Sequence, residues 1–259
     1  MNQSPLTHTL PDRQLAYQQR IASPENGGKA GVFFMGGYAS DMTGSKAVFL
    51  DAQCAQAGYG YTRFDYRGHG ASSATLEEGC IGDWFDDTLK VFDTLTTGKQ
   101  VLVGSSMGGW IGLLLARARP ERIAGFVGVA AAPDFTEDLV RPSMSAEQVT
   151  AMERDGFFYE IPAPPEGQPD DRLPISRRLM EDGANQLVLR QPLKIDAPVR
   201  LLQGQQDEDV PWQTALKLAA HIEQPNVRVT LIKDGNHRLS RAADLALLWE
   251  TVVDIVESC

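Results

Sequence analysis

The chain has 259 residues, of which 42% are hydrophobic and 22% charged, a balance typical of a soluble protein with a sizeable core. Its 24 Lys and Arg residues against 34 Asp and Glu residues give a net charge of −10, which argues against nucleic acid as a partner because such a surface repels phosphates. The three cysteines have no paired spacing, so neither a disulfide framework nor a zinc cluster is indicated.

The N-terminal stretch has no apolar run after a basic one, and it lacks the Arg and Ser enrichment of an organelle-targeting peptide. No apolar run approaches the roughly 18 residues that a membrane span requires. We therefore expect a cytoplasmic protein without a membrane span. The sequence does not indicate its oligomeric state.

Short apolar runs bounded by glycine alternate with longer stretches of helical periodicity along the chain. The runs predict strands at 32–35, 61–66, 101–103, 123–131, 199–202 and 227–232. The periodic stretches predict helices at 46–57, 81–95, 109–119, 212–222 and 242–257. Repeated strand–helix units of this kind favour an α/β fold with a mostly parallel sheet covered by helices on both faces. Ligands then bind beyond the carboxyl ends of the strands.

The region 135–191 breaks this alternation, because it contains helical stretches around a Pro-rich loop and no convincing strand. We expect a core formed by 1–134 and 192–259, with 135–191 inserted as a helical lid. A plain surface elaboration is the alternative. Met152 and the aromatic residues 157–159 could line a substrate site or simply pack the insertion onto the core.

The sharpest local signal is Gly104-x-Ser106-x-Gly108, placed between a strand pattern and a helix pattern. A sharp strand-to-helix turn would expose the Ser106 hydroxyl, and glycine at 104 and 108 avoids collisions within the turn. Ser106 is therefore the predicted nucleophile, and serine at this position points to acyl transfer. A glycine-rich turn with an N-cap serine is the alternative structure, and Ser105 has the wrong register relative to the glycines.

A serine nucleophile requires a neighbouring base, and the chain has four histidines: His8, His69, His221 and His237. Only His237 follows the last predicted strand, which fits the order nucleophile, acid, histidine. We expect His69 to be a structural residue, hydrogen-bonded within its own turn.

The acid that orients the histidine is predicted to be Asp207, in the loop after the strand at 199–202. Asp209, Asp134 and Glu208 remain less favoured candidates, with Asp209 expected to be solvated or to cap a helix.

Two backbone amides are expected to hold the oxyanion that forms during acyl transfer. One is the N–H of Met107, at the start of the helix after the nucleophile. The other is the N–H of Tyr38, in the loop after the first predicted strand, where Gly36 and Gly37 allow close backbone approach. An ordinary Gly-Gly turn is the alternative interpretation of that loop.

Together these residues resemble the α/β-hydrolase superfamily. Within it, five segments resemble a mitochondrial family of acyl-protein (palmitoyl) thioesterases that also hydrolyse acyl glucuronides: 34–38 (FMGGY), 44–47 (GSKA), 63–66 (RFDY), 103–110 (VGSSMGGW) and 209–212 (DVPW). The resemblance implies the α/β-hydrolase fold, the set Ser106, Asp207 and His237, and depalmitoylation or ester cleavage as candidate reactions. Met107 departs from the leucine that the family often has.

The functional hypothesis is a serine hydrolase that cleaves acyl esters or thioesters through a covalent acyl-enzyme, without a cofactor or metal ion. Its partner would be a small acyl ester or thioester, or an acylated protein. A serine peptidase is one alternative, and a non-enzymatic binding module on the same fold is another.

Overall fold

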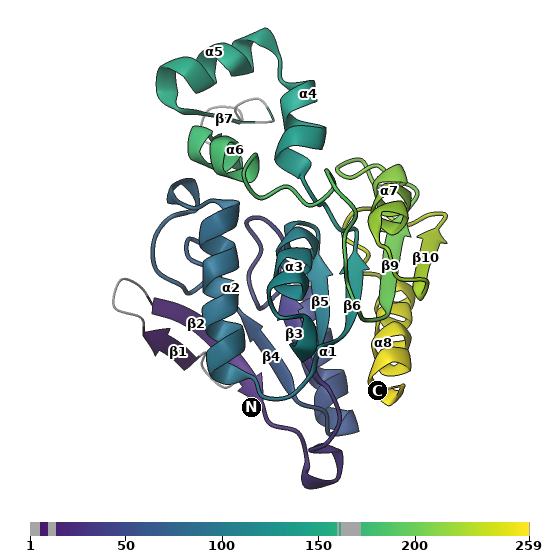
Figure 1. Cartoon of the computed structure of the whole chain (residues 1–259). Coiled ribbons are helices and arrows are strands. Elements are labelled where there is room, and N and C mark those ends of the chain that lie inside the picture. The colour runs from purple at the N-terminus through teal and green to yellow at the C-terminus, as the bar shows by residue number, and fades with distance from the viewer. Residues whose placement is uncertain (1–5, 10–13, 160, 162–171, 259) are drawn as a thin grey trace.

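The computed structural model describes residues 6–9, 14–159, 161 and 172–258 of the chain. Its centre is an eight-stranded sheet in the order β1-β2-β4-β3-β5-β6-β9-β10 (Figure 1). The strands are β1 (Leu6–Thr9), β2 (Gln14–Arg20), β3 (Gly31–Met35), β4 (Tyr61–Phe64), β5 (Gln100–Ser105), β6 (Ile123–Val129), β9 (Val199–Gly204) and β10 (Val227–Ile232). In this spatial order, neighbouring strands from β4 through to β10 pair in parallel, whereas β1–β2 and β2–β4 are antiparallel pairs.

Helices cover both faces of this sheet, as the strand–helix alternation predicts. They are α1 (Ser45–Ala57), α2 (Ile81–Leu95), α3 (Met107–Ala118), α7 (Gln213–His221) and α8 (Ala242–Glu257). Short 3₁₀ turns occur at Pro24–Asn26, Leu76–Glu78 and Pro120–Arg122. The predicted strands and helices are all confirmed, and none of their ends shifts by more than two residues.

The core is divided by the sheet into two apolar clusters. Trp84 of α2 and Trp110 of α3 are fully buried in one cluster, to which α7 also contributes. Leu50 of α1 and Val252 of α8 are fully buried in the other. The strands β3, β5 and β6 carry apolar residues on both faces and so contribute to both clusters. Their sequences are therefore nearly continuous apolar runs.

The inserted segment, residues 135–191, follows β6 and lies beyond the carboxyl end of the sheet (Figure 1). Its described part contains a π-helical turn (Thr136–Val140), α4 (Arg141–Ser143), α5 (Ala146–Asp155), β7 (Phe157–Tyr159), β8 (Pro174–Ser176) and α6 (Arg177–Gly183). The Pro-rich loop noted in the sequence lies outside the described residues.

One expectation about strands was wrong. The inserted segment does contain strand, because β7 and β8 pair as a short antiparallel ribbon. Three residues each, one of them a proline, are too few to produce a recognisable pattern. The structure also contains two strands that the sequence analysis did not predict, because β1 and β2 extend the sheet at its N-terminal edge. The mainly polar sequence of β2 hides it, since only two of its residues are buried.

Candidate active site

Ser106 lies at the turn between β5 and α3. Its backbone has φ 53° and ψ −119°, a conformation that residues other than glycine rarely adopt. Neighbouring backbone holds it there: its N–H donates to the carbonyl of Val129 at 3.0 Å, and its own carbonyl accepts from Gly109 and Ala132. This strain is the geometry expected of a nucleophile at a sharp strand-to-helix turn.

Glycine is required on both sides of Ser106 because backbone atoms occupy the space of a side chain. A Cβ at position 104 would overlap the backbone of Gly108, and one at position 108 would overlap the carbonyls of Met35 and Gly36. Backbone atoms cannot move aside as a flexible side chain can. The steric reason inferred from the sequence for the two glycines therefore holds.

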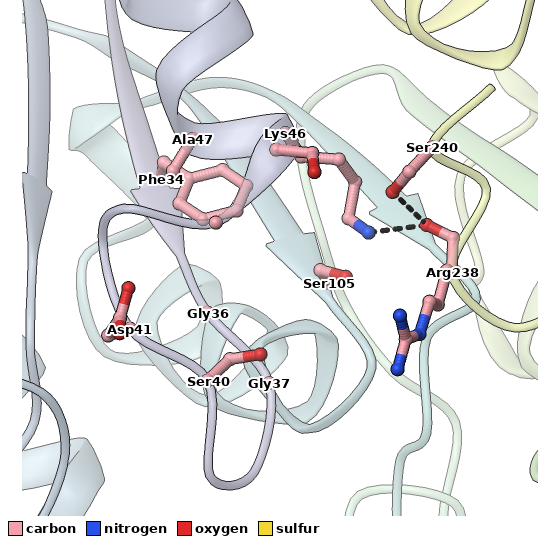
Figure 2. A pocket seen from close by; sticks show the side chains of 12 residues that line it. Phe34, Gly36, Gly37, Ser40, Asp41, Lys46, Ala47, Ser105, Arg238 and Ser240 are labelled. Atoms are coloured by element: carbon pink, nitrogen blue, oxygen red, sulfur yellow. Dashed lines mark hydrogen bonds between the residues drawn. The ribbon is translucent and has the colours of Figure 1, made fainter.

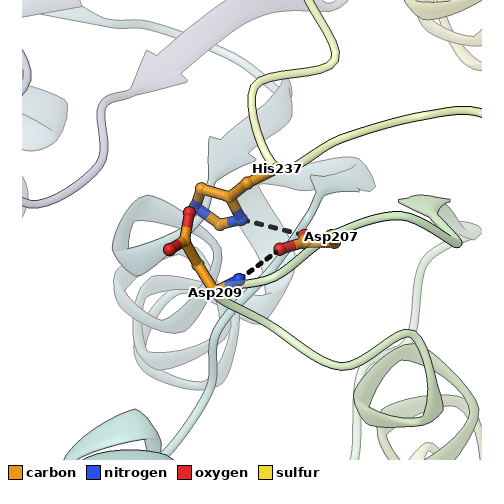
Figure 3. Close-up of side chains that lie close together, drawn as sticks. All are labelled: Asp207, Asp209 and His237. Carbon is orange, nitrogen blue, oxygen red and sulfur yellow. Dashed lines mark hydrogen bonds and ion pairs between the residues drawn. The ribbon is translucent and has the colours of Figure 1, made fainter.

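His237 connects Ser106 to Asp207. Its Nε2 lies 3.0 Å from Ser106 Oγ, and its Nδ1 lies 2.9 Å from Asp207 Oδ2. Asp207 comes from the loop after β9 and His237 from the loop after β10, so adjacent parallel strands deliver both side chains to one edge of the sheet. The structure thus places the three predicted side chains in one hydrogen-bonded chain (Figure 3 shows its His237–Asp207 half).

The Asp207 carboxylate is buried and receives several hydrogen bonds. Its Oδ1 accepts from the N–H groups of Asp209 (3.0 Å) and Val210 (2.8 Å), and its Oδ2 accepts from Gln203 Nε2 (2.8 Å). Burial by itself raises the pKa of this carboxyl group, but the hydrogen bonds from His237 and Val210 outweigh it and lower the pKa below its usual range. Asp207 is therefore ionised and accepts a hydrogen bond from the Nδ1–H of His237.

Gln203 is a part of this site that sequence reasoning missed. It is fully buried within β9, and besides Asp207 its amide also donates to the carbonyl of Val210 at 3.1 Å. The available signal was a polar residue directly after the apolar pair Leu201–Leu202, near the carboxyl end of the strand.

The loop after β3 lies against the nucleophile. A Cβ on Gly37 would come within 3.3 Å of Ser106 Cβ, a tight contact that glycine avoids. Tyr38 follows directly, and Ala39 then adopts a left-handed conformation with φ 55°. Across from this loop, Met107 opens α3, where N–H groups have no partner within the helix. The two predicted oxyanion donors thus lie on segments flanking Ser106.

His69 braces the loop after β3. It is only 2% exposed, and its Nε2 accepts the N–H of Ala39 at 3.1 Å while its Nδ1 lies 3.1 Å from the carbonyl of Arg67. This pattern is that of a neutral imidazole with its proton on Nδ1. Burial lowers the pKa of His69, which favours the same neutral form. His69 is therefore structural, as expected, but it also fixes the loop that carries Tyr38.

Side chains of the core also hold the inserted segment near the nucleophile. The hydroxyl of Tyr38 donates to the carbonyl of Pro174 in β8, and Trp110 Nε1 donates to the carbonyl of Gln186 at 3.0 Å. Phe158 of β7 is buried and packs in the same apolar cluster as Trp110. Packing onto the core is therefore the role that the structure shows for this residue.

The other acidic candidates lie elsewhere or face solvent. Asp134 is fully buried and accepts the N–H groups of Val188 (2.8 Å) and Leu189 (2.9 Å), so it holds the end of the inserted segment. Asp209 and Glu208 are exposed around the Asp207 turn.

Two further histidines and one serine complete the set of candidates. His221 lies in α7 and bonds the carbonyl of Lys217, away from Ser106. His8 belongs to β1, and its side chain is outside the described residues. Ser105 is buried at the end of β5, next to but separate from the hydrogen-bonded chain.

Asp207, Asp209 and His237 also bring three possible metal-ligand atoms within 4.8 Å of one another. Both ring nitrogens of His237, however, are already engaged by Ser106 and Asp207. The cluster therefore fits a proton-transfer chain better than a metal site, and the absence of a metal cofactor stays a prediction.

Among the described residues, no helix is both long and apolar enough to cross a bilayer.

Comparison with known proteins places this architecture in a family. Residues 32–167 match the model of the alpha/beta hydrolase fold family. The palmitoyl-protein thioesterase ABHD10 of rat mitochondria is 36% identical over 231 residues, which are 89% of this chain and 76% of the relative. Its mouse counterpart is 37% identical over 227 residues, or 88% of this chain and 75% of the relative.

Solved structures agree with this assignment. A putative hydrolase from Agrobacterium vitis S4 superposes with a TM-score of 0.89 at 37% identity, covering 98% of this chain and all of the other. Mouse alpha/beta hydrolase domain-containing protein 10 superposes with a TM-score of 0.85 at 33% identity, covering 99% of each chain. Matched in sequence and in fold over nearly its whole length, this chain belongs to the α/β-hydrolase family and is a hydrolase.

Proposed function

We propose that this chain hydrolyses acyl thioesters or esters, with Ser106 as nucleophile, His237 as general base and acid, and Asp207 as the carboxylate that orients His237. The observation that carries the proposal is the unbroken hydrogen-bonded chain from Ser106 Oγ through His237 to Asp207. The name of the rat and mouse relatives, palmitoyl-protein thioesterase, supports a thioester as the scissile bond.

In the first half-reaction, His237 Nε2 takes the Ser106 proton while Oγ attacks the acyl carbonyl carbon. The negative charge that develops on the carbonyl oxygen is held by the N–H groups of Met107 and Tyr38. Asp207 stabilises the imidazolium. When the tetrahedral intermediate collapses, the imidazolium donates its proton to the departing thiol or alcohol.

The second half-reaction releases the acid. Water gives a proton to His237 as it attacks the acyl-enzyme carbonyl, and the second tetrahedral intermediate expels Ser106 Oγ, which regains its proton from His237. The cycle includes no oxidation or reduction. It consumes the substrate and one water molecule, and it restores Ser106 and His237 to their starting protonation states.

We further propose that the inserted segment acts as a lid over this site. The contacts of Tyr38 with Pro174 and of Trp110 with Gln186 support it, because they tie the segment to the loop after β3 and to the helix that begins at the nucleophile. The inserted segment then determines which acyl chains the enzyme accepts.

The proposal is tested by labelling the purified protein with a fluorophosphonate probe and by following activated esters, long-chain thioesters and peptides as substrates. We expect probe labelling, an initial burst with a p-nitrophenyl ester, and turnover of the thioester but not of the peptide. The Ser106→Ala variant should lose labelling and turnover, and Ser105→Ala is the matched control that should retain labelling. Full labelling of Ser106→Ala would refute the assignment.

A further inference from the structure

Gln203 is a buried polar side chain to which the proposed reaction gives no role. It lies near the carboxyl end of β9, and none of its surface is exposed. Its side-chain oxygen, Oε1, has no hydrogen-bond partner among the described residues. A buried polar atom without a partner costs free energy, so packing alone does not explain a glutamine at this position.

The orientation of the Gln203 amide is fixed by its surroundings. Nε2 donates to Asp207 Oδ2 at 2.8 Å and to the backbone carbonyl of Val210 at 3.1 Å. The reverse orientation would place Oε1 against these two acceptors, which have no proton to donate to it. The amide nitrogen therefore connects β9 to both ends of the turn from Asp207 to Val210.

With the bond from Gln203, each oxygen of the Asp207 carboxylate accepts two hydrogen bonds. Oδ1 accepts from the backbone N–H groups of Asp209 and Val210. Oδ2 accepts from Gln203 Nε2 and from His237 Nδ1. Four donors fill the lone pairs of the carboxylate and so fix its rotation. Because Gln203 and His237 share one oxygen, the first bond affects the second.

This shared oxygen sets how strongly the carboxylate stabilises the imidazolium that forms during acyl transfer. A donor to Oδ2 withdraws part of its negative charge, and a less negative oxygen stabilises a positive ring less. Burial raises the pKa of Asp207, and the hydrogen bond from Gln203 is among those that lower it. Gln203 therefore acts on His237 through Asp207, without touching the reacting atoms.

The loop that carries His237 is held independently of Gln203. The backbone carbonyl of Arg238 accepts hydrogen bonds from Lys46 Nζ at 2.5 Å and from Ser240 Oγ at 2.9 Å (Figure 2). Burial and the Arg238 charge lower the pKa of Lys46 to about 8, so Lys46 loses its proton above the range in which a histidine ordinarily titrates. The Arg238 side chain is exposed, and salt and water screen its charge.

Other ionisable groups around His237 are exposed or engaged elsewhere. The Asp209 carboxylate lies close to the ring (Figure 3), but it is exposed to solvent. Tyr38, on the loop after β3, donates its hydroxyl to a carbonyl of β8. Asp134, after β6, accepts backbone N–H groups of the inserted segment. A change in the charge on buried Asp207 should therefore reach His237 directly.

We propose that Gln203 is a positioning residue for the reaction: it fixes the rotation of the Asp207 carboxylate and limits the negative charge that faces His237. The imidazolium then returns its proton readily to the leaving group. This inference rests on the proposed function. A glutamine that only stabilised the fold would leave the pH dependence of catalysis unchanged.

The test measures kcat and KM of the Gln203→Met variant with one activated ester from about pH 5 to 9. Methionine has a similar length but no donor, so Oδ2 becomes more negative and the imidazolium persists to higher pH. We expect the midpoint of the acid limb of kcat/KM to rise by about half a pH unit or more. The plateau kcat should fall about three- to tenfold, with KM nearly unchanged.

Proton NMR reports the same change without turnover. A histidine Nδ1–H that is hydrogen-bonded to a carboxylate gives a resonance far downfield of the other protons. We expect this resonance of His237 to move further downfield in Gln203→Met, because a more negative Oδ2 accepts a stronger hydrogen bond.

Gln100→Met is the matched control. Gln100 is also a buried glutamine of an interior strand, and its Nε2 donates to the backbone carbonyl of Thr97 at 2.8 Å, but it lies at the amino end of β5. Its loss should lower stability in urea titrations and leave the midpoint and the resonance in place. Gln203→Leu removes the same donors with a different shape, and it should move the midpoint in the same direction as Gln203→Met.

An unmoved midpoint in folded Gln203→Met and Gln203→Leu, or an equal shift in Gln100→Met, would overturn the inference. Failure of both Gln203 variants to fold would also overturn it, because Gln203 would then be a structural residue. Failure of the proposed function is a different result, in which the wild-type protein gives no burst and Ser106→Ala retains turnover.

Discussion

Asp207 and Asp209 lie two positions apart in one loop, yet their surroundings assign them different chemistry. The carboxylate of Asp207 is buried against His237, whereas Asp209 is exposed and contributes its backbone N–H to Asp207. Asp207→Asn should lower kcat on the order of 10³-fold or more, because an amide no longer stabilises the imidazolium.

Asp209→Asn is the matched control for this substitution, and we expect a loss of less than about threefold, as for a solvated surface group. Steady-state kinetics with one activated ester measures both variants. Equal losses in the two would contradict the assignment of Asp207 as the orienting acid.

His69 makes the native state sensitive to acid. Because burial lowers its pKa, the unfolded chain binds the proton first as the pH falls below about 6.5, the ordinary value for histidine. The unfolded state then binds more protons than the native state, so the free energy of unfolding decreases towards lower pH in this window. Protonation also removes the acceptor for the Ala39 N–H.

The replacement His69→Gln should therefore flatten the dependence of unfolding free energy on pH between about pH 7 and 5. Urea titrations of both proteins across this range measure the two slopes. His221, which is not in contact with the loop after β3, provides the comparison, since His221→Gln should leave the slope close to that of the wild type. An unchanged slope in His69→Gln would contradict this account.

At the level of elements, the sheet and the inserted segment differ in how firmly they are held. Every residue of β5 is buried, and β5 is hydrogen-bonded on both sides, to β3 and β6. In contrast, α5 has no buried residue, and β7 and β8 pair over three residues each.

We therefore expect amide hydrogens of α5 to exchange through local opening, with protection about 2 kcal/mol or more below that of β5, whose exchange approaches global unfolding. Hydrogen–deuterium exchange with peptide-level mass spectrometry measures both segments in one sample. Equal protection in α5 and β5 would mean that the inserted segment and the sheet unfold as one unit.

At the level of the whole molecule, the net charge of −10 governs interactions with other polyanions. We expect no binding of double-stranded DNA or of RNA at roughly 0.15 M salt, because phosphates are repelled from an acidic surface. An electrophoretic mobility-shift titration tests this, and saturable binding in the micromolar range would contradict it.

The helices, the parallel strands and the order of Ser106, Asp207 and His237 could be predicted from the sequence, because periodicity, glycine turns and chain order are properties of the chain itself. Local patterns could not reveal the short β7–β8 ribbon or the polar strand β2, whose pairing partners are supplied by distant parts of the fold.

Which side chains come into contact depends on the folded arrangement of the whole chain. Ser106 and His237 are 131 positions apart, and the order of strands in the sheet brings them to one edge. The same packing buries the carboxylate of Asp207, and not that of Asp209, against His237. It also brings Gln203 within hydrogen-bonding distance of Asp207, and His69 within hydrogen-bonding distance of the Ala39 N–H. Lys46 donates a hydrogen bond to the carbonyl of Arg238, 192 positions away, for the same reason. Proximity across a sheet depends on topology and burial, which no short segment encodes.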